Sequence, residues 1–196
     1  MRKKFLILLI LFLIFNLLLG QELKVTFVKK NEVKNPASKV KAIVTFKLNN
    51  VFVIEQAKII EGRNGKFVAM PSEKYRGEWK DICFPIKKEF RDEIENAILN
   101  DKFSPIPTEK QKVEITEIRI YTAKNPQSKV KAFASITLNN LFVIKDIKII
   151  EGKEGLFIGW PSIKTASGDF QKIIYPVKDE KKIEDMIIEK YKEESE

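Results

Sequence analysis

Short stretches of alternating polar and apolar residues, or of mostly apolar residues, recur along the chain, as is typical of β-strands. The alternation covers residues 25–28 and 42–48, and apolar-rich stretches follow at 51–60, 66–70 and 79–84. Asn-Pro, Asn-Asn and Gly-containing turns separate these stretches, and Asn tolerates the positive φ that a tight two-residue hairpin requires. The pattern therefore predicts antiparallel strands joined as hairpins.

Two other segments, residues 87–102 and 179–196, have the 3.6-residue period of an amphipathic helix. The apolar positions on one face are Phe90, Ile94 and Ile98 in the first segment and Ile183, Ile187 and Tyr191 in the second. Pro105 and Pro107 follow the first helix and forbid its continuation. The expected fold class is α+β, with two tandem units that each form an antiparallel β-sheet of hairpins with a C-terminal helix.

The sequence repeats itself at an offset of 90 residues, which identifies a tandem duplication. Residues 38–42 match 128–132, residues 58–62 match 148–152, and the Asn49-Asn50 pair recurs as Asn139-Asn140. After Lys74 and Lys164 the second copy gains one residue. The expected organisation is a segment at 1–21, a first repeat at 22–103, a linker at 104–111 and a second repeat at 112–196.

Residues 1–21 have the pattern of an export or anchoring segment, which we call the leader. Arg2, Lys3 and Lys4 precede an uncharged run from Phe5 to Leu19. A basic start, a short apolar core and a small residue at the end are typical of a secretory signal peptide. The run is short for a stable membrane span, which needs roughly twenty apolar residues. The leader predicts export, to the periplasm or outside the cell, with an uncleaved membrane anchor as the alternative.

Composition excludes several kinds of active site. The sequence has no histidine and one cysteine, Cys83, so an intramolecular disulfide, a Cys/His zinc site and a His-dependent triad are all excluded. Cys83 stands in an apolar alternation and is predicted to lie in the core. We expect no catalytic residue, no metal site, no cofactor and no small-molecule substrate.

The formal net charge is +9, and three of the positive charges belong to the leader. The second repeat combines a basic body with an acidic terminal helix. Such a charge distribution suits a polyanion on one surface, and it equally suits solvated lysines on exposed strands. The aromatic residues Trp79, Trp160, Tyr75, Tyr121 and Phe170 have two interpretations as well, because they can stack on nucleic-acid bases or pack in a core or interface.

The sequence resembles the stage V sporulation protein G (SpoVG) family. Residues 134–144 and 146–152 carry the resemblance in the second repeat, and residues 67–72 and 81–86 carry it in the first. The likeness covers nearly all of each repeat. It implies a non-catalytic regulatory protein of septation, cell division and sporulation in bacteria, one that binds DNA or RNA and pairs through identical subunits.

The resemblance also implies the candidate nucleic-acid-binding residues. The family's basic segment after Pro-Ser corresponds to Lys74, Arg76 and Lys164, and the basic position near its helix corresponds to Arg91, with Lys181 or Lys182 in the second repeat. These patches carry less positive charge than is usual in the family, so binding is expected to be weak and directed at phosphates. The two repeats are expected to pair within the chain. The alternative function is an exported or membrane-tethered interaction domain with an envelope protein partner, which has lost nucleic-acid binding.

Overall fold

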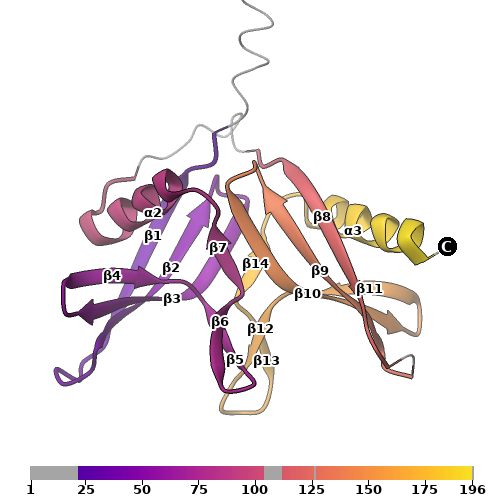
Figure 1. The fold of residues 1–196 in the computed structure, drawn as a ribbon, viewed down its shortest axis with the longest axis horizontal. Coiled ribbons are helices and arrows are strands. Elements are labelled where there is room, and N and C mark those ends of the chain that lie inside the picture. The colour runs from indigo at the N-terminus through magenta and orange to yellow at the C-terminus, as the bar shows by residue number, and fades with distance from the viewer. Residues whose placement is uncertain (1–21, 104–111, 126, 196) are drawn as a thin grey trace, which may run out of the picture.

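The computed structural model describes residues 22–103, 112–125 and 127–195, which leaves the leader and the linker outside the described residues. These residues form two five-stranded antiparallel sheets, two small hairpins and two helices (Figure 1). Each sheet is followed in the chain by a helix that packs on it, which confirms the predicted α+β class.

The first sheet has the strand order β1-β2-β3-β14, with β4 also paired to β3, and the second has the order β11-β10-β9-β8, with β7 also paired to β10. The bounds are β1 Val25–Glu32, β2 Val40–Leu48, β3 Phe52–Gly62, β4 Gly65–Ala69, β7 Cys83–Pro85, β8 Ile115–Thr122, β9 Val130–Leu138, β10 Phe142–Gly152, β11 Gly155–Gly159 and β14 Ile174–Pro176.

The two repeats exchange their last strands. β7 of the first repeat pairs with β10 of the second, and β14 of the second repeat pairs with β3 of the first. Backbone bonds extend both exchanges, because Lys145 N donates to Ile82 O at 2.7 Å and Glu55 N donates to Ile173 O at 2.7 Å. Each sheet is therefore completed by a strand from the other repeat.

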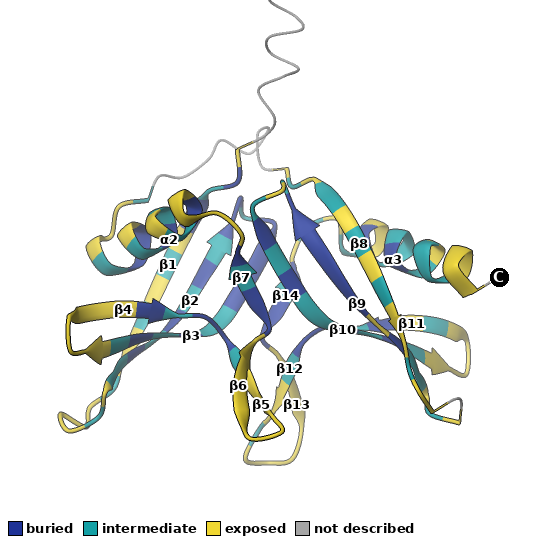
Figure 2. Cartoon of the chain, viewed as in Figure 1, coloured by how far each residue is buried: buried dark blue, intermediate teal, exposed yellow. Residues whose placement is uncertain are grey.

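A single core cluster runs through both repeats (Figure 2). The rings of Phe52 and Trp160, from different repeats, meet edge to face with centroids 6.1 Å apart, and those of Phe90 and Phe142 do the same at 6.3 Å. Cys83 is fully buried in this core, as predicted, and burial raises its pKa well above the ordinary value. A thiol held neutral in this way is unreactive at neutral pH.

The helices are α2 Lys88–Asn100 and α3 Glu180–Ser195, which flank the two sheets on opposite sides of the molecule (Figure 1). α2 buries Phe90, Ile94 and Ile98, and α3 buries Ile183 and Ile187, so the predicted apolar faces are the ones that pack on the sheets. Both helices are close to their expected bounds.

The Asn-Asn turns adopt the predicted left-handed backbone, with φ of 49° and 53° at Asn49 and Asn50. The Asn49 side chain is buried and does more than shape the turn. Its Oδ1 accepts from Lys24 N at 2.8 Å, and its Nδ2 donates to the carbonyl oxygens of Glu22 at 3.0 Å and Lys112 at 2.7 Å. It therefore ties the start of the second repeat to the start of the first.

The expected single strand at 79–84 is wrong. The chain forms β6 (Glu78–Asp81), turns at Ile82, and then forms β7 in the other sheet. β6 pairs instead with β5 (Ser72–Tyr75), a strand that the sequence pattern did not predict. β5 lies on an exposed hairpin, with Ser72 half-buried and its other three residues exposed, so it has no buried face to produce an alternation.

Candidate nucleic-acid interface

Two hairpins project from the same end of the molecule, away from the layers formed by the sheets and helices (Figure 1). The first is β5–β6, and the second is β12 (Ser162–Lys164) with β13 (Phe170–Lys172). Both are almost entirely exposed (Figure 2). We call them the hairpin pair. Their backbone continues into the core through Ile82 and Ile173, whose amides donate to Pro71 O at 3.0 Å and Pro161 O at 2.8 Å.

Three of the sequence-predicted residues lie on the hairpin pair. Lys74 is exposed on β5, Lys164 is exposed on β12, and Arg76 occupies the β5–β6 turn with φ of 51°. The Arg76 guanidinium lies 5.2 Å from the centroid of the Tyr75 ring. Lys74 and Lys164 form no ion pair among the described residues, so their charges are available to a ligand.

The other three predicted residues lie elsewhere. Arg91 is on α2, whereas Lys181 and Lys182 are on α3 at the opposite side of the molecule (Figure 1). Lys181 Nζ is 2.8 Å from Asp185 Oδ1, and the hydrogen bond to Asp185 raises the pKa of Lys181. The structure therefore does not bring the six residues together as one patch, but divides them between the hairpin pair and two separate helices.

Each hairpin places an exposed aromatic ring directly across from a lysine. Lys74 is paired with Trp79, and Lys164 is paired with Phe170. Trp79 is 67% exposed and Phe170 is 75% exposed. The sequence left both aromatic residues open to base stacking or to packing and did not select them as site residues. The signal that identifies them is the recurrence of the same lysine–aromatic pair in both repeats.

The two tryptophans, which the sequence treats alike, have different roles. Trp160 is buried, and its indole Nε1 donates to Glu184 Oε1 at 3.2 Å. It is therefore a core residue. Trp79 is open to solvent, with the Lys58 ammonium 5.8 Å from its ring centroid. Only Trp79 is placed to meet a ligand.

Acidic residues are interleaved with the cations of the first hairpin. Glu73, Glu78 and Asp81 accompany three basic residues there, so its formal charge cancels. The second hairpin carries Lys164 and Lys172 against Asp169 alone. The hairpin pair is consequently only weakly cationic, which limits how many phosphates it can neutralise.

The described part of the chain shows no cluster of three potential metal ligands. None of the helices within the described ranges is long and apolar enough to cross a membrane.

Comparison with known proteins accounts for the repeated architecture. The SpoVG family model matches this sequence twice, at residues 23–103 and again at 113–193. The chain belongs to the SpoVG family.

Individual SpoVG relatives correspond to one repeat each. A relative from Archaeoglobus fulgidus is 43% identical over 83 residues, which cover 41% of this chain and 96% of the relative. One from Agathobacter rectalis is 44% identical over 86 residues, covering 43% of this chain and 98% of the relative. One from Bdellovibrio bacteriovorus is 39% identical over 84 residues, which cover 42% of this chain and 76% of the relative. All three are named after SpoVG and septation, and none is named as an enzyme.

Proposed function

We propose that this SpoVG protein is a non-catalytic regulator of septation and cell division, and that its hairpin pair binds DNA or RNA weakly. The role in septation is supported by the names of its relatives, which are named as septation proteins. The observation that carries the binding proposal is the lysine–aromatic pair that recurs on both hairpins, Lys74 with Trp79 and Lys164 with Phe170, all exposed at one end of the molecule.

The chemistry of this surface suits a single strand without sequence preference. Lysine and arginine attract phosphates as point charges, and an exposed ring can stack on any base, contributing about 1–3 kcal/mol per base. Few cations are free of neighbouring acids, so few counterions are released on binding. We therefore expect micromolar or weaker affinity that fades at physiological salt.

Reversing the charge of Lys74, Arg76 and Lys164 together to glutamate is expected to abolish binding to a single-stranded oligonucleotide at low salt. Because three cations are involved, the parent protein should show a log–log salt slope no steeper than about −3. Fluorescence anisotropy of a labelled oligonucleotide with leader-free protein measures both quantities. Thermal stability should hardly change, since exposed charges contribute little to it.

The matched control is the triple charge reversal of Lys39, Lys66 and Lys129, which are exposed outside the hairpin pair. Lys66 lies on β4, and the other two lie in the bends before β2 and β9. It changes the net charge equally and should leave most of the binding intact. Equal losses in the two variants would show that only net charge matters and would contradict the assignment to the hairpins. Nanomolar, sequence-selective binding at physiological salt would contradict the weak phosphate mode.

We further propose that the two SpoVG units act as one intramolecular pseudo-dimer. The exchanged strands β7 and β14 support this proposal, as do the ring contacts that cross between the repeats. Joining the units in one chain raises the effective concentration of the second unit to roughly millimolar, so pairing within the chain outcompetes pairing between chains.

The alternative proposal is an interaction domain of the cell envelope, either exported or tethered to the membrane by its leader. The acids interleaved on the first hairpin favour it, because they oppose phosphate binding. β1 and β8 both start at the end of the molecule opposite the hairpin pair (Figure 1). A membrane-tethered leader would therefore leave the hairpins directed away from the membrane and towards a protein partner.

The N-terminal residue of the protein from its native host decides between these functions. Processing near Gln21 is expected if the leader acts as a signal peptide, and intact-mass spectrometry of the fractionated protein detects it. An intact Met1 in the cytosolic fraction would contradict export and leave the nucleic-acid-binding regulator.

A further inference from the structure

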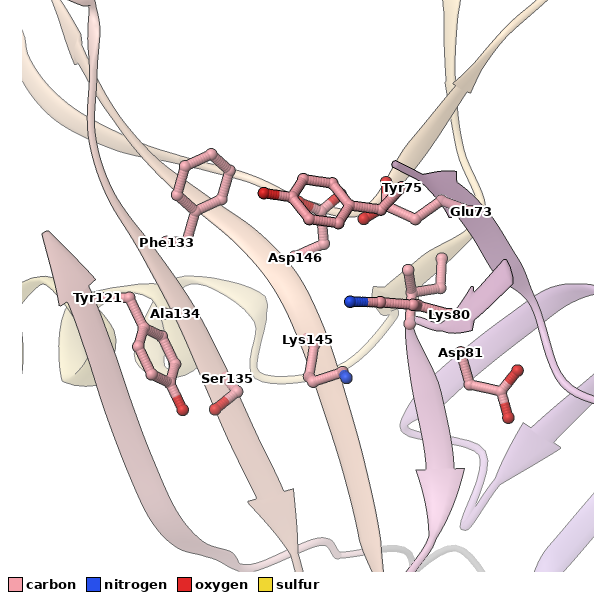
Figure 3. Close-up of a pocket in the computed structure, with 11 residues that line it drawn as sticks. Glu73, Tyr75, Lys80, Asp81, Tyr121, Phe133, Ala134, Ser135, Lys145 and Asp146 are labelled. Carbon is pink, nitrogen blue, oxygen red and sulfur yellow. The ribbon is translucent and has the colours of Figure 1, made fainter. Parts of the chain in front are cut away.

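A cavity of about 300 Å³ lies between the first hairpin and the sheet of the second repeat. Glu73, Tyr75 and Lys80 reach into it from the hairpin, whereas Tyr121 and Phe133 line it from β8 and β9 (Figure 3). The cavity exists because strand exchange carries the hairpin of one repeat over the sheet of the other. Its volume lies at the lower end of the range for small-ligand sites.

Aromatic rings form much of the wall. Tyr75, Tyr121 and Phe133 are 48%, 54% and 37% exposed, which is high for large apolar side chains. The faces of such rings attract cations. The Lys80 ammonium already illustrates this, because it lies 5.0 Å from the centroid of the Tyr75 ring.

Two carboxylates lie beside these rings and have few partners. Asp146 sits at a β-bulge with φ of 58°, is 20% exposed, and has Lys148 Nζ at 3.6 Å. Glu73 has no ion pair or hydrogen bond to its side chain among the described residues. Burial raises the pKa of both carboxyls, and the charge of Asp146 raises the pKa of Glu73 further. Two like charges are therefore held near each other in a partly desolvated place.

A buried hydroxyl completes the lining. Ser135 is only 7% exposed, and within the described ranges its hydroxyl has no hydrogen-bond partner. It has the residual solvent contact of an atom that faces the cavity, since no fully buried side-chain oxygen lacks a partner in the described structure. This oxygen is free to accept a hydrogen bond from a ligand that enters.

The other half of the molecule provides an internal comparison, since the duplication places a counterpart at each position. In that half, different residues stand at the corresponding positions: Ile163 for Glu73, Thr165 for Tyr75, Gln171 for Lys80, Asn31 for Tyr121, Ile43 for Phe133, Glu55 for Lys145 and Gln56 for Asp146. There the polar groups satisfy one another. Glu55 accepts from Gln171 Nε2 at 3.2 Å and from Tyr175 OH at 3.1 Å. The aromatic, doubly acidic lining is thus confined to one of two equivalent places.

We propose that this cavity binds an organic cation, namely the guanidinium or ammonium head of an arginine or lysine side chain or of a polyamine. The rings supply cation–π attraction, Glu73 and Asp146 supply charge-assisted acceptors, and Ser135 supplies a neutral acceptor. The lining contains three carboxylates against two ammonium groups, so its formal charge favours a cation. The cavity shares the β5–β6 hairpin with the proposed nucleic-acid interface, but none of its lining residues is Lys74, Arg76 or Lys164, so the two kinds of binding can be tested with different variants.

Isothermal titration of the full chain with Nα-acetyl-arginine amide tests the proposal, with Nα-acetyl-citrulline amide as the uncharged analogue and spermidine as the polyamine. Arginine amide or spermidine should bind and citrulline amide should not, and the tighter of the two cations identifies the source. Glu73→Gln and Asp146→Asn should each weaken binding by about tenfold, because each removes a charge-assisted bond. Asn tolerates the positive φ at residue 146, so the bulge is retained.

The Lys80→Met variant is expected to change cation binding in the opposite direction from Glu73→Gln and Asp146→Asn. It removes one of the two cations on the Tyr75 ring, leaving Arg76 in place, and keeps an aliphatic stem, so it should strengthen cation binding. Glu154→Gln, in the turn before β11 and outside the cavity, removes the same charge as the two weakening variants and should change nothing. Equal binding of the citrulline analogue, or no binding of either cation, would overturn the proposal. Binding of adenosine monophosphate that Lys80→Met weakens would overturn it too, because the ligand would then be an anion.

Discussion

Replacing Phe52 with alanine is expected to destabilise both repeats together by about 3–5 kcal/mol, as one cooperative transition. Phe52 is fully buried in the first repeat, lies opposite Pro176 of the exchanged β14, and packs against Trp160. The cavity left by its ring therefore opens in the core that the two repeats share. Urea denaturation followed by fluorescence and by circular dichroism measures the shift.

The two probes should report the same midpoint, and that midpoint should not depend on protein concentration. Concentration dependence is the mark of association between chains, whereas exchange within one chain has none. Phe67→Ala is the matched control. Because Phe67 is 43% exposed, its replacement should lower the free energy of unfolding far less. Two separate transitions, of which only one moves in Phe52→Ala, would contradict a shared core. A midpoint that rises with concentration would contradict the intramolecular pseudo-dimer.

Replacing Asn49 with alanine is expected to lower the free energy of unfolding by about 2–4 kcal/mol. The substitution removes three buried hydrogen bonds of about 1 kcal/mol each and leaves an alanine in the left-handed region, which adds about 1 kcal/mol of strain. Two of these bonds hold the chain at Lys24 and Glu22, and the third holds Lys112 at the start of the second repeat. Urea denaturation measures the loss.

Asn49→Gly separates the two contributions. Glycine accepts a φ of 49° without strain but makes no side-chain bond, so it should recover only the strain component. Asn50→Ala is the second control. Asn50 has the same backbone region, but within the described ranges its side-chain amide accepts a single hydrogen bond, from the Thr26 hydroxyl. If Asn49→Gly were as stable as the parent, the buried bonds would contribute nothing and Asn49 would serve only as a turn residue.

The candidate site was partly predictable. The family resemblance pointed to Lys74, Arg76 and Lys164, and the structure places all three on the hairpin pair. The same reasoning selected Arg91, Lys181 and Lys182, which lie on the helices instead. Residues that are neighbours in a family pattern need not be neighbours in space, because the helices pack on the outer sides of the two sheets while the hairpins leave them at one end.

The sequence by itself determined the duplication, the α+β class, the Asn-Asn turns and the buried helix faces. Each of these depends on residues within a few positions of one another: a two-residue or 3.6-residue period, or a turn that needs positive φ. The repeat offset needed only a comparison of the chain with itself. Cys83 was placed in the core for the same reason, since its neighbours alternate.

Only the tertiary structure decided which sheet receives each exchanged strand. β7 and β14 are three residues long, and the two sheets offer equivalent edges, so local sequence favours neither partner. Long-range contacts determine the partner sheet. The carbonyl oxygens of Ile82 and Ile173, just before β7 and β14, accept backbone hydrogen bonds from the opposite repeat. That exchange in turn brings the β5–β6 hairpin over the second sheet. The cavity beside Tyr75 and Asp146 therefore exists only in the folded molecule, between residues that are far apart in the sequence.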